Sequence, residues 1–150
     1  MTKLTKNFSL KEFRCKDGTD VPDEYMDNVQ ELAENLQVLR DHLGKSIRVI
    51  SGYRSPKYNR AIDGARRSQH LTASGADIKI KGLLPVEIKV IILDLIREGK
   101  MKEGGIGVYK GFLHYDIRGK KVRWRAMYSI KIDGKVVRKQ IGTFSTQAEA

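Results

Sequence analysis

The chain has 150 residues, 40% of them hydrophobic, which is enough for an ordinary globular unit with a core of its own. Its single cysteine, Cys15, excludes an internal disulfide scaffold and a zinc site built from cysteines, and no apolar run approaches the about 20 residues that span a bilayer. The net charge of +11 predicts attraction to polyanions such as nucleic acid, anionic membranes or anionic cell-wall polymers.

The N-terminal half predicts helices around one short strand. Over residues 22–44, apolar side chains recur every three or four positions, as in an amphipathic helix laid on a core. The β-branched apolar side chains within residues 46–51 predict a short strand. Pro56 indicates the start of a short helix over residues 56–62, which Gly64 closes.

The following segments predict more strands and a second long helix. Residues 75–81 favour a strand, and residues 106–109 and 112–118 favour a hairpin. A helix is expected over residues 85–99, and its inward face is predicted to hold Val86, Val90, Ile91, Leu95 and Ile96. The predicted fold class is α+β, a small and mostly antiparallel sheet with flanking helices.

The C-terminal stretch differs from the rest in its charge. Residues 120–150 hold eight Lys or Arg against two acidic residues, so we expect two units, a domain over residues 1–121 and a basic β-hairpin unit over residues 122–150. Strands over 124–132 and 135–141 flank Asp133-Gly134, which tolerates the positive φ angles of a tight turn. A capping-box spacing at residues 146–149 opens a helix that would be too short alone, so the unit is expected to be incomplete.

The three histidines have different surroundings in the sequence. His42 lies near the end of the first long helix, where a structural or surface role is expected. His70 lies in a loop and is followed seven residues later by Asp77. His114 lies in a strand whose period of two gives one polar face, formed by Phe112, His114, Asp116 and Arg118. Two histidines and one carboxylate would suit an open, catalytic zinc site, and satisfied structural histidines are the alternative.

Four motifs in this order resemble the zinc D-alanyl-D-alanine metallopeptidases. They are Ser51-Gly52-Tyr53-Arg54-Ser55, Ser68-Gln69-His70, Gly75-Ala76-Asp77, and Gly107-Val108-Tyr109 together with the strand over residues 112–118. The likeness covers about residues 7–124. It implies Zn²⁺ held by His70, Asp77 and His114. It also implies hydrolysis of peptide bonds next to a D-amino acid in peptidoglycan stem peptides or cross-links, as a carboxypeptidase or endopeptidase of the phage endolysin type.

The resemblance also implies roles for residues beside the zinc ligands. Several branches of the family place a glutamate three residues before the last histidine ligand, where this chain has Gly111. Asp116 is therefore expected to be the general base, and orientation of His114 is its alternative role. Arg54 is expected to polarise the scissile carbonyl or hold a substrate carboxylate, or else to fix its loop by an ion pair.

Three further residues of these motifs are candidates for substrate binding. Ser68 is expected near the substrate or the metal, and a local loop cap is its alternative role. Tyr53 is expected to stack or hydrogen-bond with the substrate, and Tyr109 to do so in the cleft, with aromatic packing in the core or wall as the alternative for both.

The C-terminal unit and the overall charge suggest partners other than peptidoglycan peptides. Residues 122–150 resemble the first part of the hairpin-plus-helix modules that phage and mobile-element proteins use against DNA, so weak contact with DNA or another polyanion is expected there. The alternative function is a nucleic-acid or cell-wall binding protein on a peptidase-like scaffold. No secretory signal follows Met1, so synthesis in the cytoplasm is expected, with action on the wall after release.

Overall fold

The computed structural model describes residues 2–125, 127–132 and 135–140. Its main feature is a five-stranded sheet in the order β1-β2-β4-β3-β5. The strands are β1 (Arg48–Ser51), β2 (Gly75–Lys79), β3 (Gly105–Val108), β4 (Leu113–Asp116) and β5 (Val122–Arg125). Only the edge pair of β3 and β5 is parallel. The predicted α+β class is confirmed.

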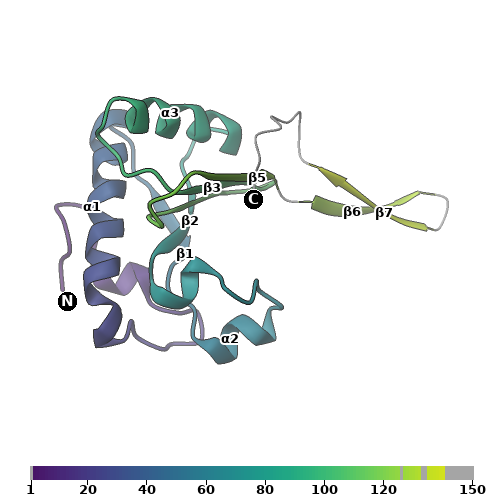
Figure 1. Ribbon diagram of the computed structural model, residues 1–150, viewed down its shortest axis with the longest axis horizontal. Coiled ribbons are helices and arrows are strands. Elements are labelled where there is room, and N and C mark those ends of the chain that lie inside the picture. The colour runs from purple at the N-terminus through teal and green to yellow at the C-terminus, as the bar shows by residue number, and fades with distance from the viewer. Residues whose placement is uncertain (1, 126, 133–134, 141–150) are drawn as a thin grey trace.

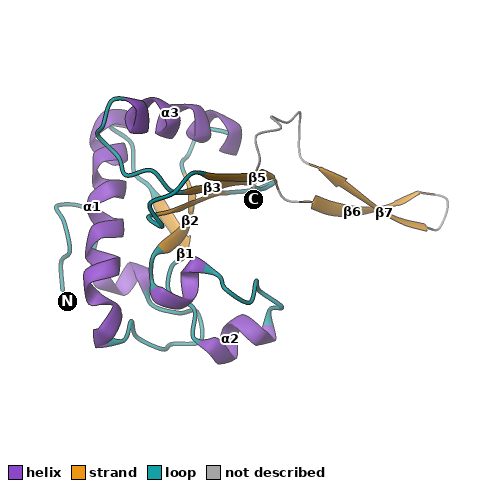
Figure 2. Cartoon of the chain, in the orientation of Figure 1, coloured by secondary structure: helices purple, strands orange, loops and turns teal. Residues whose placement is uncertain are grey.

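Three α-helices surround the sheet: α1 (Met26–Leu43), α2 (Pro56–Ala61) and α3 (Pro85–Arg97). Short 3₁₀ turns are η1 (Leu10–Phe13), η2 (Asp23–Tyr25) and η3 (Gln69–Thr72). Helix α1 ends at Gly44, whose φ of +65° is the left-handed conformation that glycine adopts without strain. Figure 1 and Figure 2 show α1 and α3 beside the sheet and α2 at the opposite end of the molecule from α3.

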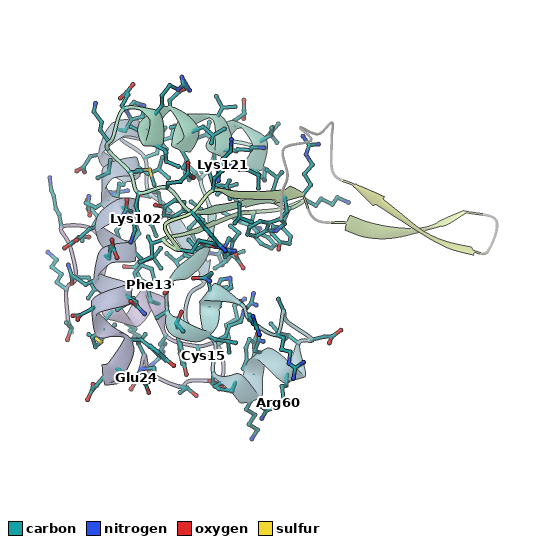
Figure 3. The ribbon with its side chains drawn as sticks, viewed as in Figure 1. Phe13, Cys15, Glu24, Arg60, Lys102 and Lys121 are labelled. Atoms are coloured by element: carbon teal, nitrogen blue, oxygen red, sulfur yellow. The ribbon has the colours of Figure 1, made fainter. Side chains whose placement is uncertain are left out.

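The hydrophobic core lies between the sheet and the helices α1 and α3. Its largest fully buried side chains include Phe13, Leu36, Ile92 and Leu113. In Figure 3, Phe13 lies inside the molecule, whereas Glu24 and Arg60 extend from its surface. Within the described residues, no helix combines the length and the apolar run needed to cross a membrane.

The inward face of α3 differs from the predicted one. Val86 and Val90 are 45% and 54% exposed, so their predicted inward positions are wrong. The buried stripe consists of Ile88, Ile92 and Leu95, spaced four and three residues apart, and of these only Leu95 was predicted. Apolar residues lie on several sides of this helix, so periodicity alone does not select the side that meets the sheet.

The C-terminal stretch begins with a strand of the main sheet. Strand β5 pairs in parallel with β3, so Trp124 and Arg125 belong to this sheet and the expectation of a hairpin strand from residue 124 is wrong. Strands β6 (Met127–Ile132) and β7 (Lys135–Gln140) pair antiparallel in a separate sheet. The Asp133-Gly134 turn and the capping box over 146–149 lie outside the described residues. The division into two domains, over residues 1–121 and 122–150, stays a prediction.

Candidate metal centre

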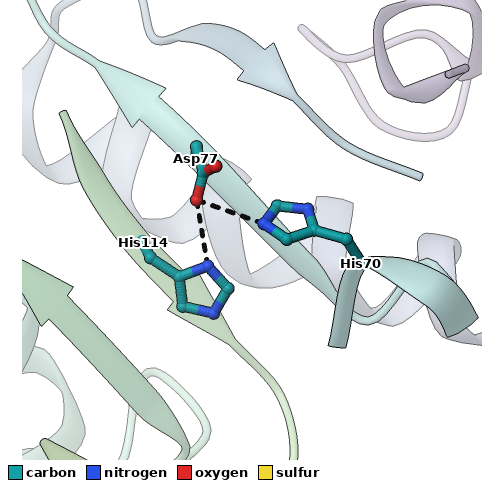
Figure 4. Close-up of side chains that lie close together, drawn as sticks. All are labelled: His70, Asp77 and His114. Carbon is teal, nitrogen blue, oxygen red and sulfur yellow. Dashed lines mark hydrogen bonds and ion pairs between the residues drawn. The ribbon is translucent and has the colours of Figure 1, made fainter. Parts of the chain in front are cut away.

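The register of three strands brings the candidate metal ligands together. His114 on β4 lies directly opposite Asp77 on β2 and opposite Gly107 on β3. His70 comes from η3, the turn that precedes β2, so it approaches Asp77 from the end of the strand. Figure 4 shows both imidazole rings directed at one carboxylate oxygen of Asp77. Residues 37 positions apart in the sequence therefore form one cluster.

The distances within this cluster suit a small cation. Asp77 Oδ1 lies 3.2 Å from His70 Nε2 and 3.0 Å from His114 Nδ1. One ligand atom from each residue lies within 4.8 Å of the others, and all three residues are buried. Two ligand atoms of a tetrahedral zinc ion are about 3.4 Å apart, given bonds of about 2.1 Å. The donor set and its spacing therefore fit zinc.

The hydrogen bonds behind the two rings decide which nitrogens face the cluster. His70 Nδ1 lies 2.6 Å from the carbonyl oxygen of Gly52, to which it donates, so a neutral His70 presents an unprotonated Nε2 to Asp77. His114 Nε2 lies 2.7 Å from Asp116 Oδ2, to which it donates in the same way. Lone pairs of neutral rings then face a carboxylate oxygen, an arrangement that a bound cation stabilises.

Burial and neighbouring charges set the protonation of these residues. Burial lowers the pKa of His70, so this ring stays neutral. Burial alone would raise the pKa of Asp77, but its interactions with His114 and His70 hold it well below its usual range. The pKa of His114 is raised, because hydrogen bonds to Asp116 and Asp77 outweigh the effect of burial. The proton between His114 Nδ1 and Asp77 must leave when a metal binds, since ligands bind deprotonated, whereas the Nε2 proton stays in its hydrogen bond to Asp116.

Asp116 lies behind His114, on the side of the ring away from Asp77. Its side chain is fully buried and holds Arg118 through Nε and Nη2, at 2.9 Å and 2.7 Å. The backbone N–H of Gly105 also donates to it at 2.9 Å. A Cβ at Gly105 would lie 2.4 Å from Asp116 Oδ2, so only glycine fits there. Although burial opposes it, these hydrogen bonds and that of His114 lower the pKa of Asp116 well below its usual range.

The ligand cluster forms part of the wall of an open cavity of about 560 Å³. The cavity is lined by all three candidate ligands and by the polar residues Arg54 and Ser68. Aromatic residues line it as well, namely Tyr109, Phe112 and Trp124. Asp116 is not among the described residues that line it. A molecule in this cavity can therefore reach the metal ligands but not the carboxylate of Asp116.

Arg54 lies beside the ligands, as the sequence predicts. Its Nη2 is 3.4 Å from Asp77 Oδ2, and its Nη1 donates to Asn59 Oδ1 at 3.3 Å. The Arg54 side chain is 16% exposed, so it is held within the cavity wall. The guanidinium therefore contacts the oxygen of Asp77 that does not face the histidines.

Ser68 and Tyr53, the predicted substrate-binding residues, have different positions. Ser68 lines the cavity, and its hydroxyl also accepts a hydrogen bond from the backbone N–H of His70 at 3.1 Å, capping η3. Tyr53 is 5% exposed, packs against Tyr25 in the core and is not among the described lining residues. Of the two roles that the sequence left open for Tyr53, these contacts favour packing in the core.

The cavity wall contains two hydrogen-bonded aromatic residues, Tyr109, which the sequence had indicated as a cleft candidate, and Trp124, which sequence reasoning missed. Trp124 Nε1 donates to the hydroxyl of Tyr109 at 3.1 Å, and the ring of Tyr109 stacks on Phe112 at 4.4 Å. A Cβ at Gly107 would lie 2.3 Å from the Trp124 ring, so Gly107 makes room for it. Glycines at alternate positions of β3 are the signal that could have indicated a large neighbouring side chain.

Comparison with models of protein families gives a match. The family model described as peptidase M15 matches residues 3–116, which include all three candidate metal ligands and end at the last residue of β4. Strand β5, which contributes Trp124 to the cavity, lies beyond the matched residues. The chain matches no curated protein and no solved structure.

Proposed function

The chain belongs to the peptidase M15 family, and we propose that it hydrolyses peptide bonds next to a D-amino acid in peptidoglycan stem peptides or cross-links. The resemblance found in the sequence is thereby confirmed, as is the zinc dependence that it implies. Membership makes the chain a metallopeptidase of the cell-wall type in general. The proposed setting is the degradation of bacterial walls by a phage endolysin.

The observation that carries this proposal is the convergence of His70 Nε2, Asp77 Oδ1 and His114 Nδ1 on an open cavity. Three protein ligands leave a position free for a reactant, which is typical of catalytic zinc sites and not of structural ones. Bound zinc supplies Lewis acidity, which polarises a carbonyl group and makes water nucleophilic near neutral pH. The protein supplies a neutral His70, a charged Asp77 and a cavity large enough for a peptide segment.

Arg54 is the residue that we assign to the scissile carbonyl or to a substrate carboxylate. Three of its five N–H groups meet protein acceptors, including Asp77, which fixes the guanidinium in the cavity wall. The remaining donors on Nη1 and Nη2 are available to a molecule in the cavity. A fixed, permanently charged fork of this kind stabilises a developing negative charge.

Of the two roles that the sequence leaves open for Asp116, its contacts support orientation of His114. A general base must reach the water from which it takes a proton, and Asp116 is fully buried outside the cavity lining. Its hydrogen bond to Nε2 instead holds the proton on the nitrogen that faces away from Asp77. A carboxylate in this position fixes the tautomer and the orientation of a histidine ligand.

The test is zinc content measured together with product release from purified peptidoglycan. We expect about one zinc per chain, loss of hydrolysis on chelation and recovery on adding zinc. His70→Ala should lose both zinc and hydrolysis. His42→Ala, which removes an exposed histidine on α1, is the matched control and should retain both.

The products also separate the two activities within the proposal. A carboxypeptidase releases a free D-amino acid from the end of the stem peptide. An endopeptidase opens cross-links without releasing a free D-amino acid. Intact peptidoglycan after incubation with the zinc-loaded protein would refute the proposed function. The expected contact of residues 122–150 with polyanions or DNA stays a separate prediction, tested by the salt dependence of binding.

A further inference from the structure

Two cations face each other on strands β1 and β2. Arg48 and Lys79 are direct cross-strand partners. Lys79 follows Asp77 by two residues on β2, so the pair lies on the face of the sheet that carries the metal ligand. Both side chains are exposed, and neither forms an ion pair within the described part of the chain. Like charges opposite each other destabilise an antiparallel pair, so folding gives no reason for this one.

The two cations line a second cavity, of about 400 Å³, next to the metal cavity. Phe112 lines both cavities and therefore marks their common border. The apolar residues that line the second cavity include Ile47, Ile78 and Ile88, all of them buried. Ile78 alternates with Asp77 and Lys79 on β2 and pairs with Leu113, so it lies on the helix side, and the cavity opens where strands β1 and β2 meet the start of α3. Its charged lining residues are Arg48, Lys79 and Lys81, and no carboxylate is among the described residues that line it. A ligand with an apolar part and a negative charge fits these walls.

The aromatic residues at the border lie in the same row of the sheet as the two cations. The backbone N–H of Tyr109 donates to the carbonyl oxygen of Phe112, and the two rings stack at 4.4 Å. Since the register of β2 with β4 pairs Ile78 with Leu113, Lys79 lies across from Phe112. Across the sheet from β3 to β1, the stacked rings of Tyr109 and Phe112 are thus followed by Lys79 and Arg48. This row of residues lies next to the row that holds the metal ligands.

We propose that the second cavity binds a free carboxylate of the peptide substrate, separated by two or three residues from the bond that is cleaved. This inference rests on the proposed function. An extended peptide advances about 3.3 Å per residue, and neighbouring strands lie about 4.8 Å apart. Two or three residues therefore suffice to place a carboxylate at Lys79 and Arg48 while the scissile bond lies at the metal ligands. The carboxylate between the two cations replaces their repulsion with two charge-assisted hydrogen bonds.

The shape of the cavity favours a peptide carboxylate over a polyanionic chain. A polyanion is held by cations spaced along an open surface, with little apolar contact. Here the cations share the cavity lining with buried apolar side chains, and Phe112 of the stacked aromatic pair lines both cavities. Apolar contact and a few placed charges are typical of sites that bind a short, specific segment.

The proposal is tested with peptides that contain a D-amino acid and in which the scissile bond is reduced to CH₂–NH, so that they bind without being cleaved. Each peptide carries Glu or Gln at the first, second or third residue on either side of this bond. Binding to the zinc-loaded protein is followed by the fluorescence of Trp124, the single tryptophan of the chain, which lines the metal cavity. In at least one position, the Glu peptide should bind about tenfold more tightly than the Gln peptide.

Variants of the cation pair should abolish this preference. In Lys79→Gln or Arg48→Gln, the dissociation constant of the Gln peptide divided by that of the Glu peptide should fall to about two or less. Lys11→Gln removes the same charge from an exposed position on η1 and should keep the full preference. Lys79→Glu should also lose the preference while unfolding at the same or a higher temperature, because it removes the repulsion from Arg48.

Several results would overturn this inference. Equal binding of Glu and Gln peptides at every position would do so, as would an equal loss of preference in Lys11→Gln, which would indicate general charge attraction. Loss of binding to double-stranded DNA in the cation variants, with the peptide preference intact, would assign the surface to a polyanion instead. The proposed function is tested separately. It is refuted if the zinc-loaded protein leaves peptidoglycan intact, whatever the result of the peptide-binding experiments.

Discussion

The two faces of strand β4 are equally buried but are stabilised by different interactions. Leu113 and Tyr115 point toward the helices, and each is fully buried in the hydrophobic core. His114 and Asp116 point to the cleft face, where they are 5% and 0% exposed. Exposure therefore does not distinguish the site from the core in this strand. The distinction lies in the partners, which are apolar side chains on one face and hydrogen-bonding groups on the other.

The polar face depends on groups that neighbouring strands provide. A buried polar group is costly unless it is hydrogen-bonded, and a buried charge is more costly still. Asp116 meets this requirement through the N–H of Gly105 on β3 and the guanidinium of Arg118. Changes on the apolar face should therefore reduce stability, whereas changes on the polar face should first reduce metal binding.

The largest effect is expected for His114→Ala. This change removes a metal ligand and the hydrogen-bond partner of both Asp77 and Asp116. We expect loss of bound zinc and of all zinc-dependent hydrolysis, measured by elemental analysis and peptide cleavage. Circular dichroism checks that the variant is folded. A folded variant that still holds about one zinc would show that the cluster is not the metal centre.

Leu113→Ala, one residue away, should have the opposite effect. It creates a cavity in the core and should lower the free energy of unfolding by about 2–5 kcal/mol, measured by urea denaturation. Its folded fraction should still bind zinc with the affinity of the original protein. A similar loss of zinc affinity in both variants would mean that the two faces are not independent.

Asp116→Asn should weaken zinc binding about 10–100-fold, as expected for a residue that orients a ligand. Zinc affinity is measured by competition with a chelator, and hydrolysis is measured at increasing zinc concentration. Recovery of hydrolysis in excess zinc supports orientation of His114. Unchanged zinc affinity with hydrolysis that zinc does not restore would instead identify Asp116 as the general base.

Gly107→Ala should have the smallest effect among these changes. The added methyl group would lie 2.3 Å from the Trp124 ring, so the ring must move and its hydrogen bond to Tyr109 should be lost. We expect a loss of about 1–3 kcal/mol of stability and a shift in tryptophan fluorescence. The control is Gly111→Ala, where the nearest atom lies 3.9 Å away, which is an ordinary contact. Identical fluorescence in Gly107→Ala would contradict the close fit.

The sequence by itself determined the features that depend on neighbouring residues. The 3.6-residue periodicity and Gly44 indicated α1, and alternation along residues 112–118 separated a core face from a polar face on β4. The helix and the two faces of the strand follow from local geometry, because helix and strand periods fix which side chains share a face. The resemblance to the metallopeptidase family implied that His70, Asp77 and His114 would meet, and the structure brings them together.

Only the tertiary structure decided which partners each of those faces meets. The side of α3 that packs on the sheet, the place of Tyr53 in the core and the entry of β5 into the sheet all depend on distant segments. The burial of Asp116 behind His114 also depends on β3, whose Gly105 leaves room for the carboxylate. Strand register fixes such contacts, and it is decided by packing across the whole sheet, since a shift of one residue turns every side chain to the other face.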